Sequence, residues 1–211
     1  MTPVTSDDRP RVVVATGNAK KLAEIRAILA TADLDVELVS MRDLDIPEPV
    51  EDGDTFEANA LIKARACVEA TGLTAIADDS GLEVDALSGD PGVWSARYAG
   101  EPADDARNNA KLIAALADVP ERRRTARFVC AAVVVAPDGR EVVVRGTMEG
   151  RIVDEPKGEN GFGYDPHFVS DVIGDGRTNA GLAPEEKDAI SQRGAAFRQL
   201  APRVEELLSS H

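Results

Sequence analysis

The chain has 211 residues, with 38 acidic and 24 basic side chains, a formal net charge of −14 and 43% hydrophobic residues. This composition is typical of a globular protein that is long enough to bury a full core. The acidic balance argues against binding to a nucleic-acid polymer, because such binding relies on a basic surface that neutralises phosphates. A single nucleotide is still compatible with this charge, since a few cations and a metal ion suffice for one small anion.

The N-terminus and the apolar runs bear on the location of the protein. Residues 1–11 are polar and contain two prolines, so they lack the basic start and apolar core of a secretory signal. We expect residues 1–10 to form a disordered arm and residues 11–211 to form one domain with two lobes. No apolar run, that at residues 131–137 included, approaches the roughly 18 residues of a membrane helix. We therefore expect a cytoplasmic protein without membrane contact.

The cysteines and histidines limit the kinds of catalytic and metal site that the chain can form. Cys67 and Cys130 are far apart, lie in apolar patterns and lack a metal-type spacing, so we expect two buried, reduced thiols. His167 and His211 are the only histidines, which gives little support to a zinc site or a histidine-dependent triad. Chemistry in this chain must then rest on carboxylates, lysines, backbone amides and a hard metal ion.

The first predicted elements are a strand, a tight turn and a helix. Residues 12–15 are apolar and predict the strand, and four apolar positions between residues 22 and 29 predict the helix. The turn between them consists of Thr16, Gly17, Asn18, Ala19, Lys20 and Lys21. Unpaired N–H groups and the helix dipole at such a terminus suit a phosphate group. The alternative is that the two lysines only solvate the first helical turn.

The second predicted helix follows an acidic loop at residues 43–54. Asp54 is the expected cap, because Glu57 three residues later completes a capping box, and Gly72 should end the helix after about residue 70. At about 100° per residue, Asn59 and Lys63 fall on or beside the apolar stripe of this helix. An inward lysine needs an anionic partner or a wet cleft that binds an anion or an activated water. The alternative is a lysine that snorkels to solvent.

The carboxylates best placed for chemistry follow a short buried strand that we expect at residues 73–77. Asp78 and Asp79 come next, before a turn at Ser80, at the carboxyl edge where open α/β sheets bind ligands. Adjacent residues of an extended chain point to opposite sides, so only one aspartate should face a given metal ion. Together with Glu51 from the acidic loop, that aspartate suits Mg²⁺, which takes few protein oxygens. The pattern Asp-Asp-Ser-Gly at residues 78–81 is also common in ordinary turns.

The remaining segments predict an α/β fold with a mixed sheet. A helix at residues 104–117 follows a glycine-rich and proline-rich loop, and Pro-Asp-Gly at residues 137–139 is a strong hairpin signal. The hairpin requires at least one antiparallel pair, whereas alternating strands and helices favour parallel pairs. Further extended segments are expected at residues 36–39, 127–136, 141–147, 151–154 and 166–171, and a last helix, capped by Ser191, at residues 191–208.

A glycine-rich loop at residues 158–166 holds two of the eight aromatic residues, Phe162 and Tyr164. Such a loop can let a nucleobase stack on a ring, or it can be a turn that its aromatic side chains tether. Lys187, Gln192 and Arg193 lie near the start of the last helix. Polar side chains there are suited to the edge of a base, and the alternative is a solvated helix end.

Six motifs, in order along the chain, carry a resemblance to a known family. They are T-G-N-x-x-K at residues 16–21, Glu51 with T-F-x-x-N-A-x-x-K-A at residues 55–64, A-D-D-S-G-L at residues 77–82, P-G-x-x-S-A-R-Y at residues 91–98, G-F-G-Y-D-P at residues 161–166, and Lys187 with S-x-R-G at residues 191–194. Together they resemble the inosine/xanthosine triphosphate pyrophosphatase family. The match spans roughly residues 12–200, and six ordered motifs are far more specific than any single one.

The resemblance implies a Mg²⁺-dependent homodimer that hydrolyses ITP, dITP and XTP to the nucleoside monophosphate and pyrophosphate, and so cleanses the nucleotide pool. It also implies an elongated mixed β-sheet flanked by helices, with two lobes and the site in a central cleft. By motif position, the turn at residues 16–21 would bind the triphosphate, and Glu51 and Asp79 would bind the metal ion. Asp79 would also take the proton from the attacking water, which Asp78 and Lys63 would support. The residues that would hold the nucleoside and base are Ser80, Phe162, Gly163, Tyr164, Asp165, Lys187, Gln192 and Arg193, with Phe162 as the stacking ring.

One position departs from the pattern of that family, which usually has histidine where this chain has Gln192. A glutamine amide can still donate to the 6-oxo group of hypoxanthine or xanthine, and Arg193 keeps the stronger donor. Adenine carries an amino donor at that position, so both side chains would face it with unpaired hydrogens. Three rivals are a pyrophosphatase for modified pyrimidine nucleotides, a nucleotide sensor without catalysis, and a Rossmann oxidoreductase, which the single Gly17 disfavours.

Overall fold

The computed structural model describes residues 9–32 and 34–209. Two compact units are each assembled from separated stretches of the chain. Unit 1 comprises Met1–Asp79, Ala131–Val144 and Ala196–His211, and unit 2 comprises Ser80–Cys130 and Arg145–Ala195. Residues 1–8 of the predicted N-terminal arm lie outside the described residues, and the grouping of residues 11–211 into one domain stays a prediction.

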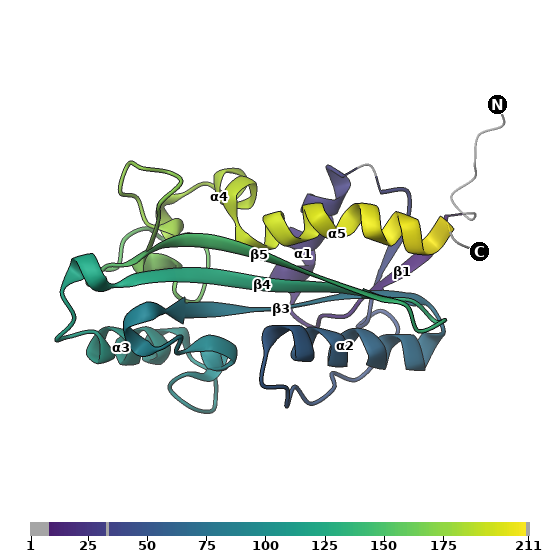
Figure 1. Ribbon diagram of the computed structural model, residues 1–211, viewed down its shortest axis with the longest axis horizontal. Coiled ribbons are helices and arrows are strands. Elements are labelled where there is room, and N and C mark those ends of the chain that lie inside the picture. Colours follow the sequence, from purple (N-terminus) through teal and green to yellow (C-terminus); the bar gives the residue numbers. More distant parts are fainter. Residues whose placement is uncertain (1–8, 33, 210–211) are drawn as a thin grey trace. The chain divides into compact units, whose positions relative to one another are not determined.

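Six strands form a mixed sheet in the order β2-β1-β3-β4-β5-β6. The long strands β3, β4 and β5 lie side by side in it (Figure 1). The strands are β1 (Arg11–Val14), β2 (Glu37–Ser40), β3 (Thr74–Val84), β4 (Thr125–Val135), β5 (Glu141–Ile152) and β6 (Phe168–Ser170). β1 pairs in parallel with β2 and β3, and β5 pairs antiparallel with β6, which confirms the predicted mixed sheet. β3, β4 and β5 each begin in one unit and end in the other.

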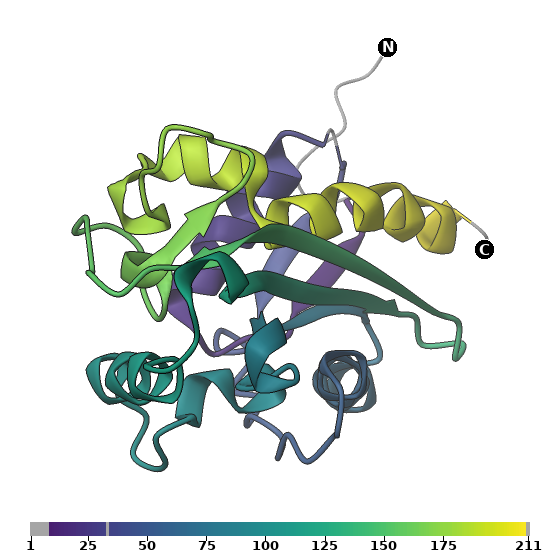
Figure 2. The ribbon, with the colours of Figure 1, turned by 60° about the vertical axis from the view of Figure 1, so that its left-hand side comes forward.

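In unit 1, helices cover both faces of the strands. They are α1 (Ala19–Ala30), α2 (Phe56–Thr71) and most of α5 (Gln192–Ser209). α2 lies on one side of the strands, and α1 and α5 lie on the other (Figures 1 and 2). Val13 of β1 packs with Ala64 and Cys67 of α2, while its fully buried neighbours Val12 and Val14 point to the opposite face. A strand that is buried on both faces explains the uninterrupted apolar run at the start of the chain.

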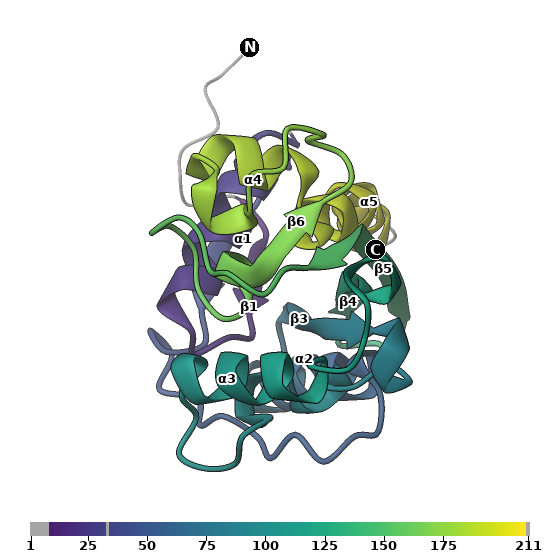
Figure 3. The ribbon, with the colours of Figure 1, turned by 90° about the vertical axis from the view of Figure 1, so that its left-hand side faces the viewer.

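In unit 2, two helices lie on opposite sides of the strands (Figure 3). They are α3 (Asp105–Ala115) and α4 (Pro184–Ile190). The core of this unit joins Leu82 and Val84 of β3 to Leu112 of α3 and Phe168 of β6. None of the described helices is long and apolar enough to span a membrane.

Several local predictions are confirmed. The helix predicted at residues 104–117 is α3, in which Asp104 accepts a hydrogen bond from the Arg107 N–H at 2.8 Å. The predicted cap Ser191 accepts from the Gly194 N–H at 2.9 Å at the start of α5. Gly72 ends α2 in the left-handed conformation, with φ of +67°. The Pro-Asp-Gly turn joins β4 to β5, and both cysteines are buried and form no disulfide.

Two local predictions are wrong, and one helix was not predicted. Thr55 rather than Asp54 caps α2, because the Thr55 hydroxyl accepts from the Ala58 N–H at 3.1 Å. β3 does not turn at residues 78–81 but continues to Val84. It continues because Leu82 and Val84 extend its apolar alternation into the core of unit 2. The short helix α4 lacked a periodic apolar pattern that would have indicated it.

Candidate active site

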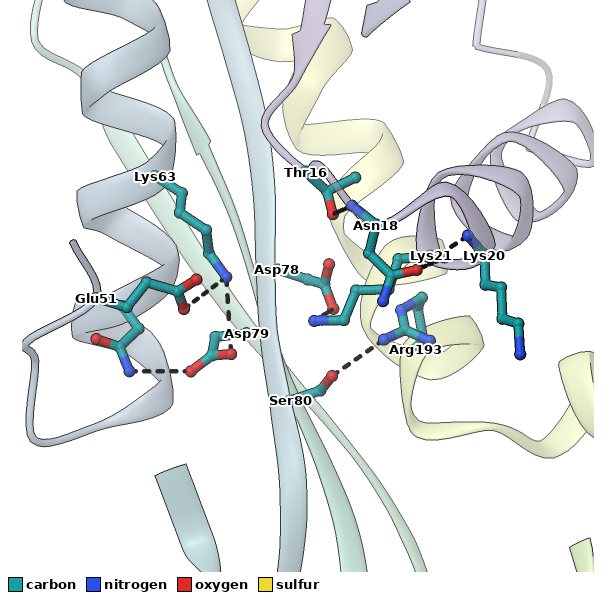
Figure 4. Close-up of polar contacts among 11 residues, drawn as sticks. Thr16, Asn18, Lys20, Lys21, Glu51, Lys63, Asp78, Asp79, Ser80 and Arg193 are labelled. Atoms are coloured by element: carbon teal, nitrogen blue, oxygen red, sulfur yellow. Dashed lines mark hydrogen bonds and ion pairs between the residues drawn. The ribbon is translucent and has the colours of Figure 1, made fainter. Parts of the chain in front are cut away.

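A buried lysine in unit 1 joins two carboxylates from different elements (Figure 4). The Lys63 Nζ lies 2.9 Å from Oε2 of Glu51 in the acidic loop and 3.7 Å from Oδ1 of Asp79 in β3. The Lys63 side chain is only 10% exposed, so it does not snorkel to solvent. The expectation that an inward lysine has an anionic partner is confirmed, and Glu51 and Asp79 both contact the same ammonium group.

Asn59, one turn before Lys63 on α2, connects the acidic loop to the same strand. Its Nδ2 donates to Oδ2 of Asp79 at 3.1 Å, and its Oδ1 accepts from the Gly53 N–H at 2.9 Å. A Cβ at Gly53 would lie 2.8 Å from Oδ1 of Asn59, so this close approach requires glycine. The loop that carries Glu51 is therefore anchored next to Asp79.

Burial and charge act in opposite directions on the two partners. Burial lowers the pKa of Lys63, but Asp79, Asp78 and Glu51 outweigh it, so the pKa is raised and the ammonium stays charged. Burial also raises the pKa of Asp79, and Lys63 and Lys21 only partly offset this increase. The Asp79 carboxylate is thus a stronger proton acceptor than an exposed aspartate.

Asp78 and Asp79 serve opposite sides of β3, as their alternation predicts (Figure 4). Asp79 faces Lys63 and Asn59 of α2, whereas Oδ2 of Asp78 lies 3.6 Å from the Nζ of Lys21 on α1. The side chain of Asp78 is completely buried. One strand therefore presents a carboxylate to each of the two helices that flank it.

The turn before α1 is held by its own side chains. Asn18 caps the helix, because its Oδ1 accepts from the N–H groups of Lys20 at 3.0 Å and Lys21 at 3.2 Å. The Thr16 hydroxyl accepts from the Asn18 N–H at 3.2 Å. The sequence suggested that first-turn N–H groups would face a phosphate; two of them donate to Asn18 instead. The Lys21 ammonium and the exposed Lys20 are then the stronger groups in this turn for binding an anion.

Gly17, in the same turn, allows a close approach of the acidic loop. A Cβ at Gly17 would lie 1.7 Å from Oε1 of Glu48, so no larger residue fits without displacing that side chain. Arg42 donates from Nη1 to the Gly17 carbonyl oxygen at 3.3 Å. Ala19 is the first residue of α1 and follows the Asn18 cap directly.

In unit 2, the predicted base-binding residues form a second cluster. Arg193 at the start of α5 is buried, and its Nη2 donates to Oγ of Ser80 at 3.0 Å. The neighbouring Gln192 is 8% exposed, and its buried Oε1 accepts no hydrogen bond from any described residue. A buried acceptor without a partner is costly, so this atom is a candidate for contact with a ligand donor.

The glycine-rich loop is organised by Asp165. Its Oδ2 accepts from the Phe162 N–H at 2.9 Å and from the Lys187 Nζ at 2.7 Å, and its Oδ1 accepts from Nδ2 of Asn179 at 3.3 Å. The Lys187 Nζ also lies 4.8 Å from the centre of the Phe162 ring. Because Asp165 is 3% exposed and makes all of these contacts, its position indicates a role in holding the loop.

Tyr164 is one of the predicted base-binding residues, and that role stays a prediction. It is buried in the core of unit 2, and its hydroxyl donates to the Ser95 carbonyl oxygen at 2.8 Å. The Ser95 hydroxyl in turn accepts from the Leu82 N–H at 2.8 Å. Tyr164 therefore anchors the loop to the turn at residues 91–98, which is the alternative that the sequence left open.

The carboxylate oxygens in unit 1 are better suited to a magnesium ion than to a metal ion whose ligands all come from protein side chains. Within residues 9–32 and 34–209, no group of three or more His, Cys, Asp or Glu side chains is arranged to hold a metal ion. Glu51 and Asp79 offer carboxylate oxygens, which are hard ligands. Mg²⁺ typically takes one or two carboxylates and completes its octahedron with water and substrate phosphates. Zinc would need more protein ligands and softer ones.

Comparison with known proteins places the chain in a family. A family model described as "Ham1 family" matches residues 12–203. The chain belongs to the Ham1 family. A dITP/XTP pyrophosphatase of Cutibacterium acnes is 53% identical over 195 residues, covering 92% of this chain and 96% of that protein.

Solved structures agree with this membership in the Ham1 family. A HAM1 protein from Coxiella burnetii is 42% identical, with a TM-score of 0.85 and coverage of 93% of this chain and 99% of that one. A nucleoside-triphosphatase / dITP/XTP pyrophosphatase from Mycobacterium abscessus is 52% identical, with a TM-score of 0.75 and coverage of 92% and 99%. Both confirm the predicted α/β class with a mixed sheet flanked by helices.

Sequence reasoning missed residues of this Ham1 protein that support the clusters without belonging to a recognised motif. Asn179, which contacts Asp165, lies in a short 3₁₀ segment with no periodic pattern. Ser95 was part of a motif, but no local signal indicated that its hydroxyl and carbonyl would join β3 to Tyr164. Such contacts between distant segments leave no trace in local spacing.

Proposed function

We propose that this Ham1 protein hydrolyses deaminated purine nucleoside triphosphates, namely ITP, dITP and XTP, to the monophosphate and pyrophosphate in a Mg²⁺-dependent reaction. The observation that carries the proposal is the buried cluster in which Lys63 contacts both Glu51 and Asp79. Carboxylates concentrated in this way suit a divalent ion and the activation of water. The names of the Cutibacterium acnes and Mycobacterium abscessus relatives support the substrate class.

In this reaction, Glu51 and Asp79 would hold Mg²⁺. The ion would neutralise charge on the phosphates and on the pyrophosphate leaving group. A water oxygen forms a bond to the α-phosphorus, and the bond from that phosphorus to the oxygen bridging to the β-phosphate breaks. The proton of the water would pass to the Asp79 carboxylate, which lies beside the Lys63 ammonium and the Asn59 amide. Lys63 and Asp78 position the water, and Lys21 binds the polyphosphate.

The base would be bound by residues of unit 2. Phe162 offers a ring for stacking, beside the Lys187 ammonium. Arg193 would donate to the 6-oxo group of hypoxanthine or xanthine. The buried Oε1 of Gln192, which accepts no hydrogen bond from the described part of the chain, would accept from the N1–H of the base. Adenine has an acceptor at N1 and a donor at position 6, so it would mismatch both side chains.

A product assay tests this proposal. The protein is mixed with MgCl₂ and ITP, dITP, XTP, GTP or ATP, and phosphorus NMR identifies the products. Pyrophosphate with the monophosphate, lost on chelation by EDTA and restored by Mg²⁺, is the expected result. Orthophosphate would indicate a γ-phosphohydrolase instead, and binding of ITP without any product would indicate a sensor. A preference for modified pyrimidine triphosphates would point to the related pyrophosphatases.

We further propose that the protein is a cytoplasmic homodimer that acts on free nucleotides, not on nucleic-acid polymers or membranes. Trp94, the single tryptophan of the chain, is 56% exposed. Beside it lies a hollow of about 660 Å³ that has both acidic residues, Asp90 and Glu101, and basic residues, Arg97 and Lys111. Both signs on one patch are compatible with a second copy packing against it. Light scattering should give a dimer for the wild type and a monomer for Trp94→Glu; a monomeric wild type would refute the dimer.

A further inference from the structure

Two side chains of helix α3 form hydrogen bonds with the glycine-rich loop at Gly163, the residue that follows Phe162. Oδ2 of Asp105 accepts from the Gly163 N–H at 2.8 Å, and Nδ2 of Asn109 donates to the Gly163 carbonyl oxygen at 2.9 Å. Both polar groups of one loop residue are therefore bound by one helix. All of these residues belong to unit 2.

The geometry of α3 lets two of its positions bind Gly163 together. Asp105 and Asn109 are four residues apart, so they lie on the same face of the helix, one above the other. Asp104 already caps the helix, which leaves the Asp105 side chain free to reach the loop. Gly163 has φ of +61°, a backbone conformation that presents its N–H and carbonyl to the helix and that other residues rarely adopt.

Two backbone carbonyl groups, one in α3 and one in the loop, orient the Asn109 amide. Its Nδ2 donates both to Gly163 and to the Asp105 carbonyl oxygen at 2.9 Å. Its Oδ1 is buried and accepts no hydrogen bond from the described residues. The opposite orientation of the amide would place Oδ1 against the carbonyl oxygens of Asp105 and Gly163, so these two acceptors fix the side chain as it is. The orientation is the one that places a donor on the loop.

The backbone around Phe162 is consequently held from two directions. Asp165 binds the Phe162 N–H from within the loop, and α3 binds the next residue, Gly163, from outside it. With the N–H of Phe162 and both polar groups of Gly163 bound, the backbone from which the ring projects has little freedom. We propose that Asp105 and Asn109 are positioning residues that set the Phe162 ring for stacking on the purine base. This inference rests on the proposed function, which assigns Phe162 to the base.

Matched substitutions on α3 separate positioning from stability. Asp105→Ala removes the acceptor for Gly163, whereas Asp105→Asn keeps a side-chain oxygen that can accept the same hydrogen bond. Asn109→Asp is nearly isosteric but replaces the donor to the Gly163 carbonyl with an acceptor. Asp118→Ala is the control, because it removes the same charge at an exposed position beyond the end of α3. Each variant is characterised by KM and kcat for ITP, the inhibition constant of inorganic tripolyphosphate, and the melting temperature.

Tripolyphosphate has no base, so its inhibition constant reports only on the residues that bind the triphosphate. We expect Asp105→Ala and Asn109→Asp to raise KM for ITP about fivefold, the effect of about one hydrogen bond. Their inhibition constant for tripolyphosphate should remain unchanged. Asp105→Asn and Asp118→Ala should remain within about twofold of the wild type in both measurements.

Other results would overturn the inference. If the KM of Asp105→Ala for ITP equals that of the wild type, the contact with Gly163 does not position the base-binding ring. If Asp105→Ala raises KM for ITP and the inhibition constant of tripolyphosphate equally, or lowers only the melting temperature, the role of Asp105 is structural. If the wild type neither binds nor hydrolyses ITP, the proposed function fails first, and this wild-type control distinguishes that outcome from failure of the positioning role.

Discussion

The two clusters of polar residues are held in different ways. In unit 1, Lys63 and Lys21 are paired with Glu51, Asp79 and Asp78, so the cluster is built from opposite charges. In unit 2, the loop around Phe162 contains the Lys187–Asp165 ion pair but is held mainly by hydrogen bonds to its backbone, supplied by Asp165 and by α3. Charge pairs can exchange partners when a charged ligand arrives, whereas backbone contacts hold a loop in one conformation.

This difference matches the two parts of the proposed substrate. A triphosphate and its metal ion bring several charges, and the unit 1 cluster can accommodate them by rearranging its ion pairs. A purine base brings a flat surface and a few donors and acceptors, which a rigid loop recognises with little loss of conformational entropy on binding. Substitutions in each cluster therefore separate the two contributions to substrate binding.

Replacing Asp79 with asparagine should abolish most turnover. The amide can still accept from Asn59 but cannot take a proton from water, so kcat for ITP should fall about a thousandfold while KM changes little. Pyrophosphate release at saturating Mg²⁺ measures both constants. Asp118→Asn, at an exposed position, is the matched control. Near-normal turnover in Asp79→Asn would remove this residue from its proposed role.

Loss of the Phe162 ring should weaken binding of the base and not of the phosphates. Phe162→Ala should raise KM for ITP tenfold to a hundredfold, because a stacked base contributes about 1–3 kcal/mol. Inhibition by tripolyphosphate should be unaffected, and Phe162→Tyr, which keeps the ring, should resemble the wild type. An equal loss of affinity for tripolyphosphate would show that the two clusters do not divide the substrate in this way.

Removal of the Lys63 charge should destabilise the protein chiefly when no divalent ion is present. Lys63→Met leaves the Glu51 and Asp79 carboxylates without their shared cation, which should lower the free energy of unfolding by about 2 kcal/mol in EDTA. Mg²⁺ bound by the folded protein should reduce this loss. Urea denaturation with EDTA and with MgCl₂ measures the difference.

The control lies on the same helix. Arg65→Met breaks a pair with Glu141 in which the arginine side chain is 55% exposed, so it should cost no more than about 1 kcal/mol in either buffer. A loss in Lys63→Met that is the same with and without Mg²⁺ would mean that the two carboxylates do not bind the ion.

The cysteines offer one probe in each unit. Burial raises the pKa of the Cys67 thiol to about 11, above the value of about 8.5 for an unfolded cysteine. The thiol is therefore almost fully protonated at pH 8 in the folded protein, and iodoacetamide should modify it at least about a hundredfold more slowly than in urea. Peptide mass spectrometry follows Cys67 in unit 1 and Cys130 in unit 2 separately. Rapid labelling of Cys67 without denaturant would contradict the buried packing of α2.

By itself, the sequence determined the features that depend on neighbouring residues. The cap at Ser191, the helix end at Gly72 and the hairpin after β4 follow from residues within a few positions of the backbone groups that they satisfy. The alternation of a strand also determined that Asp78 and Asp79 point to opposite sides, and the period of α2 determined that Lys63 points inward. The error at Thr55 is a shift of one residue between two side chains that can both cap a helix.

Which partners these side chains meet depends on the tertiary structure. Glu51 and Asp79 reach Lys63 because the acidic loop is anchored by Asn59 and because β3 continues through residues 78–81 instead of turning. Gly163 meets Asp105 and Asn109 across separations of 58 and 54 positions in the chain. Local patterns reflect forces that act over one helical turn or one strand, whereas these contacts depend on how distant segments pair and pack, which no short stretch of sequence encodes.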